Sequence, residues 1–365
     1  MTFMIQQPDL NKLAMAEADV QALDKEGRLA RMHALLEESH ALLDWGIESM
    51  ITGEGKSVAG IAVLYSGGND STCLAHMFRG RVDVAVHANT TIGIEETRDF
   101  VRKTCLDWGL ELREYYPPAG STYRELVVDQ GFPGPGHHWK MYQRLKERCL
   151  RQARAQIVSN PRKERVVFLA GRRRTESARR ANVPELNREG SVVWVSPLVN
   201  WTKTDLYTYR DWAGDVPRNR VSDLIHMSGE CLCGAFAHKD ELAEVEMFFP
   251  DVAAQIRELE VEVAAAGHPA KICKWGWGAT EKLTPEDMKS GPLCSSCEYR
   301  QEVTESEALR EKTSFKMGVE PRMYDWDIAP FDGNQEAPRE KTSMRYRTPI
   351  MFDTDLADFL REKQQ

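Results

Sequence analysis

Leu64-Tyr65-Ser66-Gly67-Gly68-Asn69-Asp70-Ser71-Thr72 is the stretch of sequence that decides the fold. The apolar run at residues 58–63 precedes it, and residues 73–77, which are typical of a helix, follow it. The pattern predicts a strand, a glycine turn and a helix in immediate succession. Amides at the beginning of a helix favour anions, and glycines let a ligand approach the backbone closely. We expect a phosphate-binding loop here rather than an ordinary tight turn, because hydroxyl groups flank the glycines on both sides.

Length and composition are those of a soluble globular protein. The chain has 365 residues, of which 42% are hydrophobic and 28% charged, so it can bury a large core. No apolar run approaches the roughly 18 residues that span a bilayer. Residues 1–7 lack the basic and apolar parts of a signal peptide. We therefore expect a cytoplasmic protein, whose eight cysteines are thiols or metal ligands rather than disulfides.

Charge is distributed unevenly along the chain. The net charge is −8, but residues 138–180 contain 14 lysines and arginines against 3 acidic residues. Such segregation predicts a basic surface that faces an anion, although a solvated helix face accounts for some of these charges. The excess is larger than one nucleotide requires, which makes a nucleic acid (tRNA or DNA) a candidate partner of this segment.

Helical and strand patterns alternate along the first part of the chain. Apolar residues recur near helical spacing from residue 8 to residue 51, which predicts one or two helices. Residues 81–87 and 110–116 are predicted to be strands, with a helix at 94–108 between them. The alternation indicates a parallel sheet covered by helices, in which ligands bind beyond the carboxyl ends of the strands.

A helix at 139–158 and two strands, at 166–171 and 191–195, are predicted next. The apolar stripe of this helix is Met141, Leu145, Cys149, Ala153 and Ile157, and its basic face is Lys140, Arg144, Lys146, Arg148, Arg151 and Arg154. The strand at 166–171 runs into three arginines, 172–174, which repel one another. A phosphate or sulfate group would neutralise them through bidentate contacts. Further on, Thr202 is expected to cap a helix, with Asp205 three residues later.

Four ordered blocks over about residues 58 to 212 together resemble the phosphoadenosine phosphosulfate (PAPS) reductase family of the PP-loop superfamily. Residues 66–71 are similar to its SGG-x-DS loop. Residues 89–97 are similar to its D-T-G…E-T block, with Asn89 at the acid and Thr91 at the glycine. Residues 171–177 are similar to its G-x-R-x-x-E-S motif, and residues 197–205 to its P-L-x-x-W-t-x-x-D block.

This resemblance implies an α/β fold with a doubly wound, mostly parallel sheet of the adenine nucleotide alpha-hydrolase-like type. It also implies an adenine nucleotide as ligand, either ATP or PAPS. The nucleotide-binding residues that it implies are Ser66, Gly67, Gly68, Asn69, Asp70, Ser71, Thr90, Gly171, Arg172, Arg174 and Glu176. Ser66 and Asp70 are the catalytic candidates, and Asp70 can help to hold Mg²⁺ if the nucleotide is ATP.

Two departures from the family bear on the reaction. Reductases of the family carry a catalytic cysteine in a C-terminal E-C-G-[LI]-H motif, whereas this chain has no cysteine after Cys297. The Cys-Cys pair of the iron–sulfur branch is also missing near the helix that begins at Trp139. The resemblance therefore supports the family's nucleotide site in this chain more strongly than it supports PAPS reduction. The superfamily also includes ATP pyrophosphatases that adenylate a substrate and sulfurtransferases that act on tRNA or DNA.

A group of cysteines in the last third of the chain predicts a metal site. Cys231-x-Cys233 and Cys294-x-x-Cys297 form two closely spaced pairs with turn residues beside them, and four thiolates bind either Zn²⁺ or a [4Fe-4S] cluster. Cys273 is a fifth candidate, either a ligand, a reactive thiol or a packed side chain. The remaining cysteines, Cys73, Cys105 and Cys149, lie on helix stripes and are expected in the core.

These observations predict four regions: a helical N-terminal extension at 1–55, a nucleotide domain at 56–225, a cysteine-rich metal-binding region at 226–304 and an extended tail at 305–365. The favoured function is an adenine-nucleotide enzyme of sulfur metabolism or sulfur transfer. One alternative is an ATP-dependent sulfurtransferase or modification enzyme that acts on tRNA or DNA. Another is a non-catalytic binding module that zinc stabilises.

Overall fold

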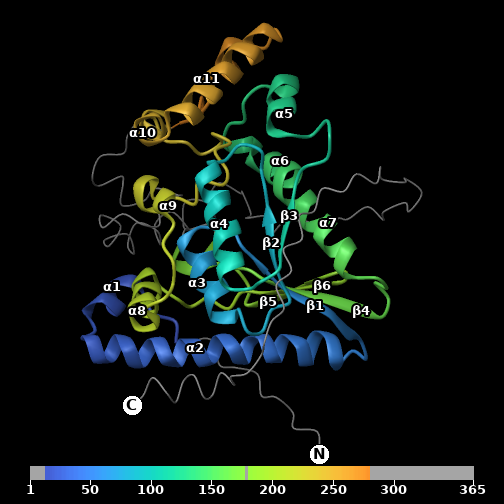
Figure 1. Ribbon diagram of the computed structural model, residues 1–365, viewed down its shortest axis with the longest axis vertical. Helices are drawn as coiled ribbons and strands as arrows, with labels where there is room; N and C mark the ends of the chain where they lie inside the picture. The colour runs from blue at the N-terminus through green and yellow to red at the C-terminus, as the bar shows by residue number, and fades with distance from the viewer. Residues whose placement is uncertain (1–12, 177–179, 280–365) are drawn as a thin grey trace, which may run out of the picture.

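A six-stranded sheet forms the centre of the protein, in the strand order β3-β2-β1-β4-β6-β5 (Figure 1). The computed structural model describes residues 13–176 and 180–279. The strands are β1 (Ser57–Leu64), β2 (Val84–Ala88), β3 (Leu112–Tyr115), β4 (Glu164–Leu169), β5 (Leu186–Glu189) and β6 (Val192–Val195). All neighbouring strands pair in parallel except β5, which pairs with β6 in antiparallel orientation. The predicted α/β fold with a mostly parallel sheet is confirmed.

Helices fill the connections between the strands. The α-helices are α1 (Glu17–Ala22), α2 (Lys25–Ile47), α3 (Asn69–Phe78), α4 (Glu95–Asp107), α5 (Tyr123–Gln130), α6 (His138–Met141), α7 (Arg148–Ile157), α8 (Lys203–Ala213), α9 (Arg220–Ile225), α10 (Glu241–Phe248) and α11 (Pro250–Ala265). Two π-helical segments, η1 (Glu48–Thr52) and η3 (Tyr142–Glu147), extend α2 and join α6 to α7. The predicted N-terminal helices are present, whereas the sequence patterns missed α5, α9 and the short strand β5. In the described part of the chain, no helix is long and apolar enough to cross a membrane.

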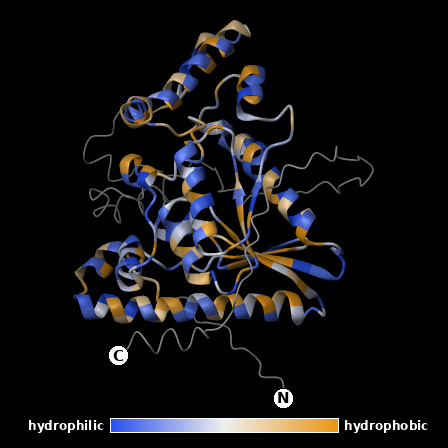
Figure 2. Ribbon diagram, in the orientation of Figure 1, coloured by the Kyte–Doolittle hydropathy of each residue, from blue (hydrophilic) through white to orange (hydrophobic). Residues whose placement is uncertain are grey.

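Each face of the sheet carries its own apolar core. Val63, Val167 and Val193 belong to the core beneath α2, α3 and α8, whereas Phe168 and Trp194 belong to the core that α7 covers. Neighbouring residues of one strand thus enter opposite cores, as the pleat requires. Figure 2 shows that the strands at the centre of the sheet are largely hydrophobic. Cys73, Cys105 and Cys149 are buried in these two cores, which confirms their predicted place.

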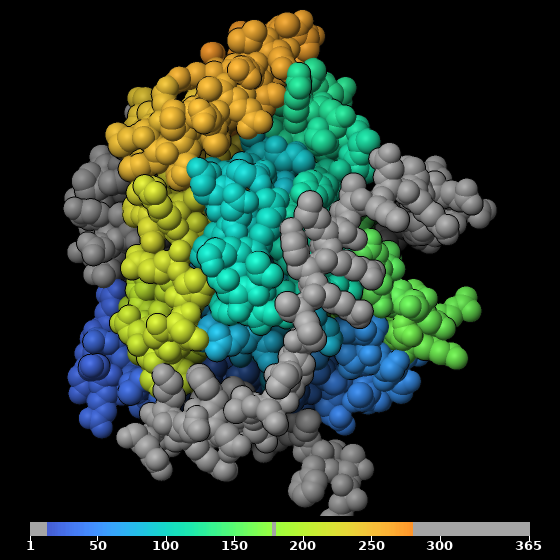
Figure 3. All heavy atoms as spheres, in the orientation of Figure 1, coloured from blue at the N-terminus to red at the C-terminus, as the bar shows by residue number. Residues whose placement is uncertain are grey.

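A third apolar cluster lies outside the sheet and organises the chain after α8. It joins residues of α5, η3, α10 and α11 with Cys233, Cys273 and Trp275. Figures 1 and 3 show α10 and α11 at one end of the molecule, beside α5. Helix α11 begins with Pro250, a residue that suits the first helical turn.

A buried ion pair fixes α2 to α8. The Arg31 guanidinium donates to both carboxylate oxygens of Asp205, at 3.0 and 3.2 Å. Asp205 is also the third helical residue of α8, where it completes a capping box with Thr202. The expected cap at Thr202 is therefore confirmed, and the Asp205 carboxylate that completes it also binds Arg31 of α2.

His76 occupies the contact between α3 and α8. Its Nδ1 lies 2.6 Å from the Tyr209 hydroxyl, and its Nε2 lies 3.0 Å from Oδ1 of Asp215. Burial, together with the nearby Arg79, lowers the pKa of His76 to about 4. The folded protein thus keeps this imidazole neutral at pH values where the unfolded chain would protonate it.

We predict that His76 makes the protein less stable as the pH falls through the window from about 6.5 to about 4, because the unfolded state binds more protons there. His76→Gln removes this contribution and should reduce the stability lost between about pH 7 and pH 5 by about 2 kcal/mol at most. Urea unfolding of both proteins at the two pH values measures the difference. Equal losses in the two proteins would contradict the assignment.

Candidate nucleotide and thiol site

The glycine loop, residues 66–71, follows β1 and leads into α3 as predicted. Gly67 has φ +77°, and a Cβ there would lie 2.9 Å from Cγ2 of Thr97 in α4. A Cβ on Gly68 would lie 3.2 Å from Cβ of Ser228. Gly67 therefore requires glycine, both for its backbone angle and for its close packing, whereas a side chain at Gly68 would displace Ser228 by a few tenths of an ångström.

Hydroxyl groups hold this loop in shape. Ser71 and Thr72 both donate to the carbonyl of Gly68, at 3.0 and 2.8 Å, and Ser66 Oγ lies 3.1 Å from Ser71 Oγ. Gly68 is the residue that caps α3 at its N-terminus. The loop thus places two serine hydroxyls at the positive end of a ten-residue helix, which is the arrangement that suits a phosphate group.

The arginine loop, residues 171–176, lies against the glycine loop. Arg173 Nε donates to Oδ2 of Asp70 at 2.7 Å, and the Arg173 side chain is only 2% exposed. Gly171 packs on the backbone of Asp70 and Ser71, where a Cβ would lie 3.4 Å from both. The structure therefore brings the predicted glycine and arginine loops together at one edge of the sheet.

Every arginine of this loop has a partner within the chain. Arg174 pairs with Glu185 and donates to Oδ1 of Asn200 at 3.2 Å, and the Arg172 guanidinium lies 4.7 Å from the centre of the Trp194 ring. Carboxylates and an indole thus relieve the mutual repulsion of the three arginines, which was the reason to expect an anionic ligand here. The roles of Arg172, Arg174 and Glu176 in nucleotide binding stay predictions.

Two residues that contact the glycine loop were not predicted from the sequence. They are Arg210, which donates to Oδ1 of Asn69 at 2.6 Å, and Asn219, which donates to the carbonyl of Gly67 at 2.9 Å. Arg173 was predicted only as part of the arginine run 172–174. The motif gave a signal for Arg173, because it stands at the arginine of G-x-R-x-x-E-S. Arg210 and Asn219 lie outside the recognised blocks, so no signal pointed to them.

The β2 loop, residues 89–94, is strained where the family pattern has glycine. Thr91 has φ +62°, a conformation that β-branched residues rarely adopt. Asn89 Oδ1 accepts from the Thr91 amide, and Thr91 Oγ1 accepts from the Tyr123 amide at the start of α5. The nearby Thr90, a predicted nucleotide contact, is fully buried, and its hydroxyl donates to the carbonyl of Glu230.

The cysteine segment, residues 228–234, packs directly on the glycine and β2 loops. The Ile94 amide donates to the carbonyl of Gly229 at 2.8 Å, and the Leu232 amide to that of Ile92 at 2.7 Å. Ser228 covers Gly68, as described above, and its carbonyl accepts from the Thr97 hydroxyl at 2.6 Å. The chain therefore places Cys231 three residues from a direct contact with the predicted phosphate loop.

The thiols of Cys231 and Cys233 shift each other's pKa in opposite directions. The hydrogen bond from the Cys233 thiol outweighs burial and, with the Lys146 ammonium, lowers the pKa of Cys231 to about 6. The same bond raises the pKa of Cys233. Lys146, expected on the basic face of its helix, therefore acts on Cys231, and it belongs to the π-helical segment η3, a kind of helix often found at functional sites.

The predicted four-cysteine metal site falls only half within the described residues. Cys294 and Cys297 lie outside them, and the described residues contain no group of three metal-binding side chains. Cys273 is buried, and its Sγ lies 3.4 Å from the carbonyls of His268 and Pro269, so the structure gives it a packing role.

Three arginines of the basic segment share one helix face. Burial, Arg144 and Arg151 together lower the pKa of Arg148, which reflects unrelieved positive charge. Arg148 donates to the neutral Ser121 hydroxyl at 2.6 Å, and Arg151 pairs with Glu147. Among the residues that the structure describes, neither Arg144 nor Arg148 has an ion-pair partner.

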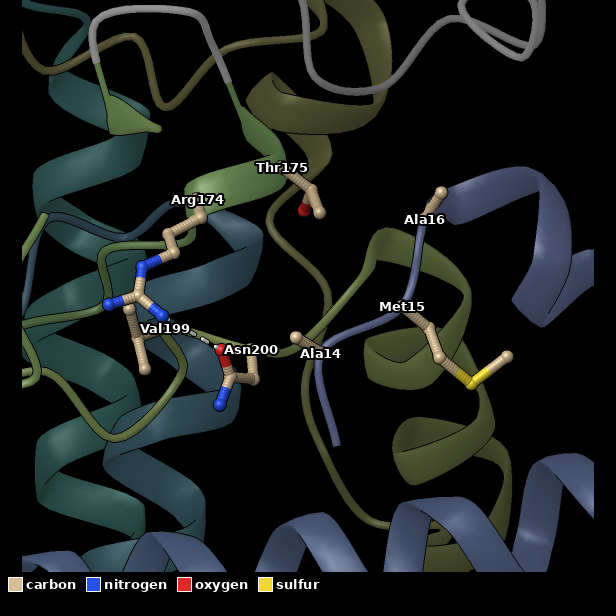
Figure 4. Close-up of a pocket in the computed structure, with 7 residues that line it drawn as sticks. All are labelled: Ala14, Met15, Ala16, Arg174, Thr175, Val199 and Asn200. Atoms are coloured by element: carbon tan, nitrogen blue, oxygen red, sulfur yellow. Dashed lines mark hydrogen bonds between the residues drawn. The ribbon is translucent and has the colours of Figure 1, made fainter. Parts of the chain in front are cut away.

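A pocket of about 290 Å³ lies on the outer side of the arginine loop (Figure 4). Its lining consists of Ala14, Met15, Ala16, Arg174, Thr175, Val199 and Asn200. Figure 4 shows the Arg174 side chain directed toward Asn200, to which it is hydrogen-bonded. Because this bond and the Glu185 pair occupy the guanidinium, the pocket presents mainly small and apolar side chains.

Comparison with known families supports the resemblance seen in the sequence. Residues 60–221 match the sequence model of the phosphoadenosine phosphosulfate reductase domain. The predicted resemblance to the PAPS reductase family is therefore confirmed for this part of the chain. No curated protein matches the sequence.

Several solved structures are similar to the chain. The PAPS reductase of Candida auris in its phosphate complex shares 18% identity over 56% of this chain and 93% of its own, with a TM-score of 0.38. The U34-tRNA thiolase NcsA of Methanococcus maripaludis, with its [4Fe-4S] cluster, shares 13% over 78% and 94%, with a TM-score of 0.36. Yeast FAD synthetase shares 12% over 72% and 96%, with a TM-score of 0.32.

We predict that Arg173→Leu destabilises the fold by about 3 kcal/mol or more, because it leaves the Asp70 carboxylate without its buried partner. Arg174→Leu is the matched control, since the Arg174 and Glu185 side chains are 27% and 23% exposed and such a pair contributes about 1 kcal/mol or less. Urea unfolding of the two variants measures both free energies. Equal destabilisation would show that Arg173 has no special part in holding the glycine loop.

Proposed function

We propose that the chain is an enzyme of sulfur metabolism or sulfur transfer, which binds an adenine nucleotide on the glycine loop and uses it beside the thiols of Cys231 and Cys233. The observation that carries this proposal is the contact of the cysteine segment with the glycine loop through Ser228 and Gly68. The match of residues 60–221 to the PAPS reductase family supports a nucleotide at that loop. A reaction between a bound nucleotide and a thiol requires that the two groups lie close together, as they would at this edge of the sheet.

Two nucleotides suit this arrangement. With ATP, the reaction would cleave the nucleotide at its α-phosphate, whereas with PAPS or adenylyl sulfate a nucleophile would attack the sulfur of the nucleotide. Ser66, Ser71 and the first amides of α3 would bind the phosphates. Asp70 is already paired with Arg173, so a Mg²⁺ ion would be held largely by the nucleotide, as is usual for this ion.

A metal centre fits the donor set of the cysteine segment. Cys231 and Cys233 would supply two thiolates and Cys294 and Cys297 the other two, which suits Zn²⁺ or a [4Fe-4S] cluster. A cluster would supply electron transfer or a sulfur-binding iron, whereas zinc would stabilise the fold. The half-buried Lys146 charge near the cysteine pair would offset part of the negative charge of the thiolates.

We expect ATP with Mg²⁺, or PAPS, to bind the full chain in a calorimetric titration. Ser66→Ala should weaken binding roughly fivefold, because about 1 kcal/mol is the usual net contribution of one hydrogen bond. Ser57→Ala is the matched control at the opposite end of β1 and should bind as the wild type does. If the folded protein binds neither nucleotide, the proposal fails, and zinc in such a protein would favour the non-catalytic binding module instead.

A second candidate function, modification of tRNA or DNA, rests on the charge of Arg144 and Arg148. Two guanidinium groups without carboxylate partners in the described part of the chain suit a polyanion. Both belong to the helical run of η3 and α7, which also carries Lys146 toward Cys231. A nucleic acid on this surface would therefore bring an acceptor close to the thiols.

We predict that a tRNA or a DNA duplex binds with an affinity that falls steeply as salt is raised. Arg144→Glu should weaken this binding and reduce the salt slope by about one. Arg188→Glu makes the same change of charge on β5, where Arg188 pairs with Glu54, and should leave binding nearly unchanged. Fluorescence anisotropy at several salt concentrations measures both variants, and binding that salt does not affect would exclude a nucleic acid at this surface.

A further inference from the structure

Glu230 connects the β2 loop to the cysteine segment through several bonds at once. Its Oε1 accepts from the Thr90 amide at 2.8 Å, and its Oε2 lies 3.1 Å from Nε2 of His87. Its backbone carbonyl accepts from the Thr90 hydroxyl. A Cβ on Gly93 would lie 2.6 Å from that carbonyl, so the absence of a side chain at Gly93 is what lets Glu230 approach.

The Glu230 carboxylate is charged although it is only 1% exposed. Burial raises its pKa, but His87 and Arg98 outweigh burial and hold the pKa below its usual value. Burial likewise lowers the pKa of His87, but Glu230 outweighs it, so the net shift is upward. His87 Nδ1 lies 2.8 Å from the carbonyl of Tyr65. Glu230 is thus joined through His87 to the residue that directly precedes the glycine loop.

The network around Glu230 is not fully satisfied. Arg98 Nε lies 3.5 Å from Oε2 of Glu230, which is long for a hydrogen bond. Within the part of the chain that the structure describes, Arg98 Nε and Nη2 are buried and have no hydrogen-bond partner. Two unmet buried donors cost free energy, so a small movement of Glu230 toward Arg98 would be favourable if the loops allowed it.

We propose that Glu230 is a positioning residue, which couples nucleotide occupancy of the glycine and β2 loops to the position of the cysteine segment. The Glu230 carboxylate binds Thr90 directly and reaches Tyr65 through His87, and the Glu230 backbone continues into Cys231. A nucleotide that shifts the β2 loop would therefore move Glu230 and close its contact with Arg98. This inference rests on the proposed function, because it takes an adenine nucleotide as the ligand.

Hydrogen–deuterium exchange of the full chain, as purified with any metal it carries, tests the coupling. The readout is the exchange rate of amides in the cysteine segment, such as that of Leu232, with and without ATP and Mg²⁺ or PAPS. We expect saturating nucleotide to slow this exchange about fivefold or more in the wild type, the lower end of usual coupling between sites. A purely structural role for Glu230 would leave the nucleotide effect intact.

Three variants separate positioning from folding. Glu230→Gln keeps the shape but removes the charge and turns a donor toward Thr90 or His87, so the nucleotide effect should disappear. Glu230→Asp keeps the charge on a shorter side chain and should retain part of the effect. Glu241→Gln is the matched control, because Glu241 is also buried but accepts from the His238 amide, near the start of α10, and its nucleotide effect should equal that of the wild type.

The outcomes distinguish this inference from the proposed function. If nucleotide binds to the wild type but leaves exchange in the cysteine segment unchanged, the coupling is wrong and the proposed function survives. An equal nucleotide effect in Glu230→Gln and the wild type would also overturn it. If no nucleotide binds, the proposed function itself fails. If Glu230→Gln does not fold, the wild type and Glu230→Asp still test the coupling. A nucleotide effect on exchange that is as large in Glu230→Asp as in the wild type would contradict a role for the position of the carboxylate.

Discussion

The close approach of three chain segments at Gly67 and Gly68 is the constraint on which the site depends. Gly67 leaves room for Thr97 of α4, and Gly68 leaves room for Ser228 of the cysteine segment. Any side chain at either glycine would push one of these neighbours away from the end of β1. The residues that form the predicted phosphate cradle are therefore also the residues on which α4 and the cysteine segment pack. Fold and site share one requirement at this point of the sheet.

Buried charges around that point are arranged as pairs between distant parts of the chain. Arg173 and Asp70 are 103 residues apart, His87 and Glu230 are 143 apart, and Arg31 and Asp205 are 174 apart. A buried pair adds little stability compared with apolar packing, but removing one partner leaves an uncompensated charge and costs much more. These pairs therefore act mainly on geometry. They fix which loop lies beside which, and so they define where a nucleotide would meet the thiols.

Local sequence signals predicted the elements that local chemistry decides. The strand, glycine loop and α3 follow one another as expected, and Thr202 and Asp205 form the expected capping box. Contacts between distant segments could not be predicted, because no sequence pattern indicates that Arg173 pairs with Asp70 or that Lys146 lies near Cys231. The π-helical segment η3 changes which side chains share a face, and a strict period of 3.6 cannot anticipate that. The strand β5 was missed because its four residues, Leu-Asn-Arg-Glu, lack a strand pattern.

The thiols and the glycine loop belong to different apolar cores. Cys233 packs with α5, α10 and α11, whereas Tyr65 and α3 belong to the core beneath the sheet. Ile92 and Ile94 of the β2 loop are part of the thiol core, so this loop lies on the boundary between the two. Close-packed cores resist small displacements, and adjustments cost least where one core meets another. A thiol that has to approach a bound nucleotide is therefore best placed at such a boundary, held by a few hydrogen bonds and a buried carboxylate rather than by the sheet itself.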